Sequence, residues 1–405
     1  MSATRQLFLK HLAPTSPSPM GLEIVQGRGI YLKSAGGKRY MDLISGISVS
    51  NLGHHHPVVH KAILKQLKRF THLMVYGELV QAPQVKFATA LAKVLPSALQ
   101  SVYFVNSGSE AIEGALKLAK RATGRHEIIS CENAYHGSSH GALSIMGSEY
   151  FKSAFRPLLP GVRHIRFNHW EDLEKITCRT ACVVMETVQG EAGALPPLPG
   201  YLKAVKERCA FTGTLLILDE IQAGFGRTGS LFGFEQEEVV PDVLVLAKGF
   251  GGGMPLGAFI ASPELMQTLS VSPVLGHITT FGGHPVSCAA GGATLDVLQA
   301  EQLPEKAKEH EAWIRSTLTH PLLQGISGRG LLLALHFTDT ETNFAVIREA
   351  LHRGLLTDWF LFNDKALRLA PPLIITPTQL KKACDVLMKA MDAVYARRGV
   401  LQTPV

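Results

Sequence analysis

The middle of the chain alternates short apolar runs with longer amphipathic segments. Segments at residues 109–124 and 200–213 place apolar side chains at helical spacing. Unbroken apolar runs, as expected of strands buried on both faces of a sheet, occur at residues 101–105, 127–131, 181–185, 215–218 and 243–247. This alternation predicts an α/β fold whose main sheet is largely parallel.

Sheets of this class bind their ligands at the carboxyl ends of the strands. The polar residues that directly follow the predicted strands should therefore converge on one site. They are Asn106 to Ser109, Glu186 to Glu191, Asp219 to Gln222, and Lys248.

The pattern changes after about residue 290, where longer helical segments surround two short apolar runs, at residues 330–337 and 366–376. This change predicts a second, smaller α+β domain. We therefore expect an N-terminal segment at residues 1–50 that joins the smaller domain, a large domain at residues 51–288, and a small C-terminal domain at residues 289–405.

The composition is that of a globular protein, with 46% hydrophobic and 18% charged residues. The net charge of +7 is spread along the chain without a basic block, which argues against nucleic-acid binding and fits an attraction for small anions. No apolar run approaches the roughly 20 residues of a membrane-spanning helix, so we expect no membrane contact. The six cysteines lack paired spacing, which predicts reduced thiols and a cytoplasmic location.

Lys248 ends an apolar run and is followed at once by a glycine-rich stretch. An amine in such a place is desolvated, which lowers its pKa and makes it a usable nucleophile for a Schiff base with an aldehyde. The glycines would let a cofactor approach the backbone closely. The alternative is a lysine that caps a strand and extends its amine to solvent.

Ser107, Gly108 and Ser109 join a predicted strand to a predicted helix. The free N–H groups and the positive end of the helix dipole would form a phosphate cradle there. A plain helix cap explains the serines equally well.

Asp219 ends a strongly apolar strand. An unpaired carboxylate is costly at such a position, so we expect a cationic partner. A protonated pyridine nitrogen would serve, and so would an arginine or a backbone amide.

Two other motifs do not lead to a site. Gly224, Gly226 and Gly229 satisfy the G-x-G-x-x-G spacing, but they do not join a strand directly to a helix, which argues against a nicotinamide dehydrogenase. The adjacent histidines at residues 54–56 have no accompanying carboxylate or cysteine cluster, so we expect no metal site.

Taken together and in this order, six segments resemble the signature of class III aminotransferases, which are pyridoxal 5'-phosphate enzymes of fold type I. The resemblance runs from about residue 22 to about residue 376. The segments are GKRYMDLISGISVSNLGHHHP, VNSGSEAIEGALKLAKRATG, METVQGEAG, LILDEIQAGFGRTG, PDVLVLAKGFGGGMPLGAF and TTFGGHPVSCAA.

The resemblance implies a role for each matching residue toward the cofactor. Lys248 matches the Schiff-base lysine and Asp219 the partner of the pyridine nitrogen. Gln222 matches the contact to the phenolic oxygen, while Ile221 and Tyr135 match the residues on the two ring faces. The phosphate contacts correspond to Ser107, Gly108, Ser109 and, from the neighbouring subunit, Thr280, which implies a homodimer with shared active sites to which the N-terminal segment contributes contacts.

The same resemblance implies a substrate site. Arg368 matches the arginine that binds the carboxylate of 2-oxoglutarate or glutamate, Glu191 matches an acid that pairs with this arginine, and Tyr76 matches an aromatic residue of the pocket. The chain departs from the family at Ser138, where acetylornithine and ornithine enzymes commonly carry arginine, and at Thr187, where the family usually carries proline. Ile47 also stands where the ornithine enzyme has a substrate-binding tyrosine.

The sequence therefore predicts a transaminase that moves an amino group from an amine or amino-acid donor, terminal amines included, to a keto acid by a two-stage ping-pong mechanism. The expected acceptor is 2-oxoglutarate, with pyruvate the alternative. An aminomutase or racemase of the same fold would share Lys248 and Asp219. A protein that binds pyridoxal 5'-phosphate without turnover is the alternative from a different class.

Overall fold

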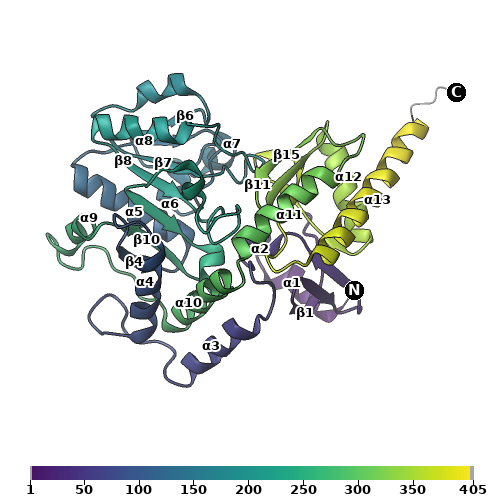
Figure 1. Cartoon of the computed structure of the whole chain (residues 1–405), viewed down its shortest axis with the longest axis horizontal. Helices are drawn as coiled ribbons and strands as arrows, with labels where there is room; N and C mark the ends of the chain where they lie inside the picture. Colours follow the sequence, from purple (N-terminus) through teal and green to yellow (C-terminus); the bar gives the residue numbers. More distant parts are fainter. Residues whose placement is uncertain (1, 402–405) are drawn as a thin grey trace.

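A seven-stranded sheet forms the centre of the larger part of the molecule (Figure 1). The computed structural model describes residues 2–401. All neighbouring strands of this sheet are parallel except β10, which is antiparallel to both of its neighbours. In spatial order the strands are β4 (Ser101–Val105), β10 (Gly257–Ala261), β9 (Val243–Leu246), β8 (Leu215–Asp219), β7 (Thr180–Glu186), β5 (Glu127–Cys131) and β6 (Val162–Ile165).

The central strands β7, β8 and β9 are buried on both faces of the sheet, which explains why they read as unbroken apolar runs. Val184, Ile217 and Val245 belong to a core cluster that also contains the apolar residues of helix α5 (Gly108–Thr123). The side chains next to them along the strands, such as Met185 and Leu218, belong to the larger cluster on the opposite face. That cluster also contains apolar residues of α8 (Tyr201–Thr212) and α10 (Pro285–Ala300).

The smaller part of the molecule contains two four-stranded sheets. One is antiparallel and consists of β11 (Gly325–Arg329), β12 (Leu332–His336), β15 (Asn363–Leu369) and β14 (Trp359–Phe360). The other combines β1 (Ile24–Arg28), β2 (Tyr31–Ser34), β3 (Arg39–Asp42) and β13 (Leu355–Leu356), so strands from both ends of the chain share one sheet. Helices α11 (Leu303–Thr317), α12 (Thr340–His352) and α13 (Pro377–Leu401) accompany these sheets (Figure 1).

The predicted fold class is confirmed: a large, mainly parallel sheet is joined to a smaller α+β part. Apart from the N-terminal helix described next, the other α-helices of the described residues are α2 (Ser45–Ser48), α3 (Pro57–Leu67), α4 (Ala82–Val94), α6 (His140–Ser144), α7 (Glu149–Lys152) and α9 (Pro263–Gln267). Within residues 2–401, no helix has both the length and the apolar character needed to cross a membrane.

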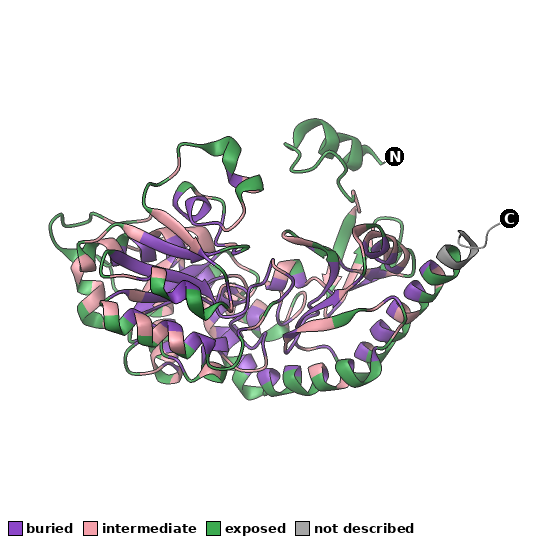
Figure 2. Ribbon diagram, turned by 90° about the horizontal axis from the view of Figure 1, so that it is seen from above, coloured by how far each residue is buried: buried purple, intermediate pink, exposed green. Residues whose placement is uncertain are grey.

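The N-terminal helix α1 (Ala3–His11) has no buried residue. Figure 2 shows it in green, lying apart from the buried centres of both parts of the molecule. Its apolar side chains Leu7 and Leu9 are both more than half exposed, at 56% and 54%. The helix therefore makes little contribution to the core of this chain.

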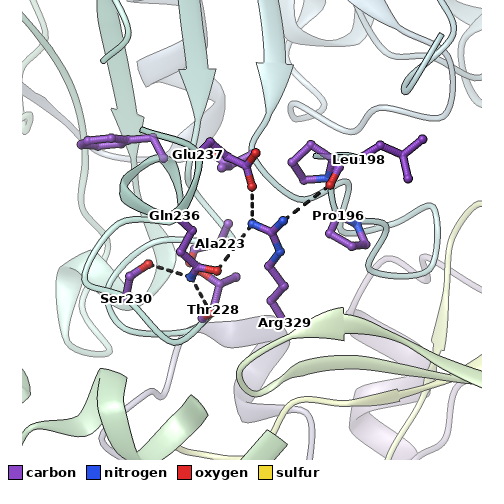
Figure 3. Close-up of polar contacts among 12 residues, drawn as sticks. Pro196, Leu198, Ala223, Thr228, Ser230, Gln236, Glu237 and Arg329 are labelled. Carbon is purple, nitrogen blue, oxygen red and sulfur yellow. Dashed lines mark hydrogen bonds and ion pairs between the residues drawn. The ribbon is translucent and has the colours of Figure 1, made fainter. Parts of the chain in front are cut away.

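Arg329, at the end of β11, connects the C-terminal sheet to loops of the large sheet (Figure 3). Its guanidinium donates to the carboxylate of Glu237 and, at 3.5 Å, to the carbonyl of Pro197. Gln236 accepts a further contact at 3.5 Å and donates in turn to the carbonyl of Thr228. This junction links one sheet to the other, and none of Arg329, Gln236 and Glu237 lines the cavity described next.

Candidate active site

A cavity of about 450 Å³ opens at the carboxyl ends of β7, β8 and β9, where the strand-end rule places a ligand site. The structure brings most of the sequence-predicted cofactor residues onto its wall. These are Ser107, Gly108, Ser109, Tyr135, Asp219, Ile221, Gln222 and Lys248, together with Glu191 from the predicted substrate set.

Lys248 follows β9 and begins a short 3₁₀ helix that continues to Gly251. Its backbone has φ of 53°, a left-handed conformation that is strained for a lysine. Burial lowers the pKa of its amine, and the charges of Glu191 and Asp219 offset only part of this effect. The amine therefore loses its proton, and becomes nucleophilic, at a lower pH than the amine of an ordinary lysine does.

Asp219 ends β8 and is held at both carboxylate oxygens. Its Oδ1 accepts from the backbone N–H of Ile221 at 2.9 Å, and its Oδ2 lies 2.7 Å from Nδ1 of His136. The other ring nitrogen of His136 lies 3.2 Å from Oγ of Ser130. The carboxylate is thereby fixed in one orientation on the cavity wall.

His136 is almost fully buried. Burial by itself lowers the pKa of its imidazole, but the hydrogen bond and the charge of Asp219 outweigh that effect and raise the pKa. The sequence analysis did not assign a role to His136, although its place directly after Tyr135, a predicted cofactor residue, indicates a position near the site.

The expected phosphate loop lies at the start of α5. Ser107 caps this helix through its side chain, which accepts from the N–H of Glu110 at 3.2 Å. The first-turn amides of a helix have no partner within it, so those of Gly108 and Ser109 are available to an anion on the cavity wall. Gly137 packs close to this loop, since a Cβ there would lie 1.9 Å from Oγ of Ser109.

Glu186 is a second carboxylate on the cavity wall that the sequence analysis placed at a strand end without giving it a role. It accepts from the backbone N–H groups of Gly190 at 3.0 Å and Tyr135 at 3.2 Å. Burial raises its pKa to about 7, even though the charge of His136 and these two hydrogen bonds act in the opposite direction.

Arg368, on β15, is 2% exposed and lies behind Glu191. Its Nη2 donates to both carboxylate oxygens of Glu191, at 3.1 and 3.0 Å. Glu191 itself lines the cavity and also accepts a contact from Gln222 at 3.4 Å. Burial would raise the pKa of Glu191, but Arg368 more than compensates and lowers it.

Thr280 and Tyr76 do not line the cavity of this chain. Thr280 is exposed and Tyr76 is half-buried. The structure therefore does not bring these two predicted residues together with the rest of the site.

The structure also shows what the two departures from the family pattern contact. The hydroxyl of Thr187 donates to Oε1 of Glu220 at 2.8 Å, and both side chains are buried. Ser138 is exposed; its hydroxyl lies 3.2 Å from that of Tyr135, and its backbone N–H donates to Ser109. Neither side chain carries a cationic group into the cavity.

The residues around the cavity fit pyridoxal 5'-phosphate. A lysine with a lowered pKa suits its aldehyde, and the amides at the start of α5 suit its phosphate. A carboxylate held by two donors suits a protonated ring nitrogen. Ile221 and Tyr135 supply apolar surface for the ring.

Comparison with known proteins agrees with this fit. The profile of the aminotransferase class-III family matches residues 13–391. An ornithine aminotransferase from Toxoplasma gondii is similar over 98% of this chain and 96% of its own, with 29% identity and a TM-score of 0.90. A transaminase from the marine bacterium Virgibacillus is similar over 98% of this chain and 100% of its own, with 26% identity and a TM-score of 0.92.

A thermostable (S)-enantioselective omega-transaminase from Thermomicrobium roseum is also similar, with 30% identity, a TM-score of 0.87 and 97% of each chain covered. The chain belongs to the class III aminotransferase family. Members of this family are transaminases that depend on pyridoxal 5'-phosphate, and the predicted enzyme class and cofactor are thereby confirmed.

Proposed function

We propose that the protein transfers an amino group from an amine or amino-acid donor, terminal amines included, to a keto acid, with 2-oxoglutarate as the acceptor. The observation that supports this most directly is the placement of Lys248, Asp219 and Glu191 on one cavity, with Arg368 directly behind Glu191. We place the reaction in the cytoplasm, in line with the reduced cysteines.

Pyridoxal 5'-phosphate, when bound, supplies an aldehyde that condenses with amines and a ring that accepts electrons. Lys248 would hold the cofactor covalently through its ε-amine. With the cofactor bound and its link to Lys248 opened by an incoming amine, the Lys248 amine, whose pKa is lowered by burial, would serve as general base and acid for the proton at the substrate carbon. Asp219, fixed by His136 and Ile221, would keep the ring nitrogen of the bound cofactor protonated.

Arg368 and Glu191 allow one cavity to accept two kinds of substrate. A donor without a second carboxylate leaves the ion pair intact, so the buried guanidinium stays neutralised. A dicarboxylate such as 2-oxoglutarate would replace Glu191 on Arg368, because the planar guanidinium matches a carboxylate with two parallel hydrogen bonds. Glu191 has Gln222 as a neighbouring donor on the cavity side.

We also propose a homodimer. Thr280 is exposed in this chain and is absent from its cavity wall, so it is free to reach the phosphate site of a second copy. Tyr76 lies outside the cavity of its own chain in the same way and could line the partner's pocket. Sedimentation of the purified protein tests this proposal, and a monomer that turns over would refute it.

A spectroscopic screen tests the proposed reaction. The protein loaded with pyridoxal 5'-phosphate is mixed with α-amino acids and with terminal amines, and a reactive donor changes the visible absorbance of the bound cofactor. Addition of 2-oxoglutarate should then restore the original spectrum and release glutamate. Lys248→Ala should abolish the response, whereas Lys206→Ala, which removes an ion pair with Asp242 away from the cavity, should keep it.

The outcome separates the alternatives. Conversion of a donor without any keto acid would indicate an aminomutase or racemase. A bound cofactor whose spectrum no amine changes would indicate a protein without turnover. Restoration by pyruvate but not by 2-oxoglutarate would change the proposed acceptor.

A further inference from the structure

Arg368 is held by two carboxylates, and the sequence analysis identified only one of them. Besides Glu191, Asp358 contacts the guanidinium, with Oδ1 2.9 Å from Nε of Arg368. The ring of Phe360 lies 4.3 Å from Cζ of Arg368, and the carbonyl of Trp359 accepts from Nη2 at 3.2 Å. The remaining nitrogen, Nη1, is buried and has no hydrogen-bond partner in the described part of the chain.

The two carboxylates occupy different positions relative to the cavity. Glu191 lines the cavity, whereas Asp358 does not. Asp358 directly precedes β14, and its carbonyl accepts from the backbone N–H of Arg368 on the paired strand β15 at 2.9 Å. Asp358 is thus tied to Arg368 through a backbone hydrogen bond of the sheet as well as through its carboxylate.

The energetics of a buried arginine make this difference consequential. Arg368 is 2% exposed, and removing the only counter-ion of such a group leaves an uncompensated buried charge. Replacing Glu191 by a substrate carboxylate requires a stage at which Glu191 has released Nη2. During that stage Asp358 still holds Nε, so the guanidinium remains paired and keeps its orientation.

We propose that Asp358 is a positioning residue: the fixed counter-ion that keeps Arg368 directed at the cavity while Glu191, the exchangeable counter-ion, is replaced by a substrate carboxylate. The inference rests on the proposed function, because it assumes that Arg368 receives a carboxylate. It predicts that removing the carboxylate of Asp358 and removing that of Glu191 have opposite effects on the binding of a dicarboxylate to Arg368.

Equilibrium binding of glutarate tests this inference without turnover, because glutarate has two carboxylates but neither an amino nor a keto group. Its dissociation constant is measured by calorimetry at pH 8 on protein loaded with pyridoxal 5'-phosphate. Asp358→Ala should weaken binding on the order of tenfold, the effect of losing a hydrogen bond to a charged group. Asp358→Asn keeps an acceptor for Nε but loses the counter-charge, so it should weaken binding by less than Asp358→Ala but still measurably, by about threefold. Glu191→Gln should tighten binding, because it removes the charge that competes for Nη2.

Glu237→Ala is the matched control, since it takes one carboxylate from another arginine, Arg329, at a site outside the cavity (Figure 3). It should leave glutarate binding unchanged even where it lowers the melting temperature. A role in folding alone would make Asp358→Ala behave like this control.

Tighter or unchanged glutarate binding in Asp358→Ala would overturn the inference, and so would a wild-type protein that does not bind glutarate. If Asp358→Ala does not fold, the Asp358→Asn variant decides the question. Glutarate binding that is tightened in Asp358→Asn as much as in Glu191→Gln would show that Asp358 competes with the ligand for Arg368, and the inference would fail. Failure of the proposed function is recognised separately: the expected glutarate pattern without amino transfer to 2-oxoglutarate would refute the reaction and leave the role of Asp358 standing.

Discussion

The imidazole of His136 and the carboxylate of Asp219 share a hydrogen bond of 2.7 Å in the buried wall of the cavity. His136→Leu removes this partner, and Oδ2 of Asp219 then lacks a donor where water is scarce. We expect the affinity for pyridoxal 5'-phosphate to fall on the order of tenfold, because Asp219 loses a hydrogen bond worth about 1–3 kcal/mol that fixes its carboxylate in the orientation needed for the ring nitrogen. Absorbance titration of the apoprotein with the cofactor measures the change.

Ser130→Ala serves as the control for this variant. It removes the longer contact of 3.2 Å at the other ring nitrogen and leaves the bond to Asp219 in place. Its effect should be clearly smaller. Equal losses in the two variants would mean that His136 matters for packing and not for orienting Asp219.

Thr187 stabilises a buried carboxylate, and its removal should have a pH-dependent effect. Glu220 accepts from Thr187 and from the N–H groups of Gly233 and Phe234, yet burial raises its pKa to about 7. The ordinary pKa of a glutamate carboxyl is 4.5, so the folded state keeps this proton up to a higher pH than the unfolded chain does. Burial of Glu220 therefore does not lower the free energy of unfolding below pH 4.5, where the carboxyl is protonated in both states. Its full destabilising effect is present above about pH 7.

Thr187→Val deletes a donor to the charged form, so the free energy of unfolding should fall by about 1–2 kcal/mol at pH 8 and by less at pH 5. Urea denaturation at the two pH values measures this difference. Thr187→Ser retains the hydroxyl and should stay close to the wild type at both. Equal losses at pH 5 and pH 8 would show that the methyl packing of Thr187, and not its hydrogen bond, accounts for the effect.

The sequence located the cavity because parallel strands end at a common edge. Asp219 and Lys248 end neighbouring strands, and Ser107 follows a strand of the same sheet, so one topological rule brings them together. The contact between His136 and Asp219 joins residues 83 positions apart, and one of them lies in a loop whose path no periodic pattern specifies.

Asp358 was missed for a related reason. It precedes β14, a strand of only two residues, and its position depends on pairing with β15. So short an element has no recognisable alternation in the sequence. Thr280 and Tyr76, by contrast, came from the resemblance to the family, and their proposed roles need a second copy of the chain.

The loop that carries the phosphate amides is packed too closely to tolerate a side chain at Gly137. This glycine has φ of 125°, which disfavours any other residue, and a Cβ there would lie 1.9 Å from Oγ of Ser109. Gly137→Ala should displace Ser109 and with it the first turn of α5. Affinity for pyridoxal 5'-phosphate should then fall on the order of tenfold or more, whereas affinity for pyridoxal without the phosphate should change little, because the anion loses its aligned amides.

Gly200→Ala separates this effect from backbone strain. Gly200 also has a positive φ, 82°, but a Cβ there would meet nothing within 4 Å, and Gly200 lies outside the cavity wall. That variant should lose stability and keep its affinity for the cofactor. If Gly137→Ala weakened pyridoxal and pyridoxal 5'-phosphate equally, the contact with Ser109 would serve the shape of the whole cavity, and the amides at the start of α5 would not be the phosphate site.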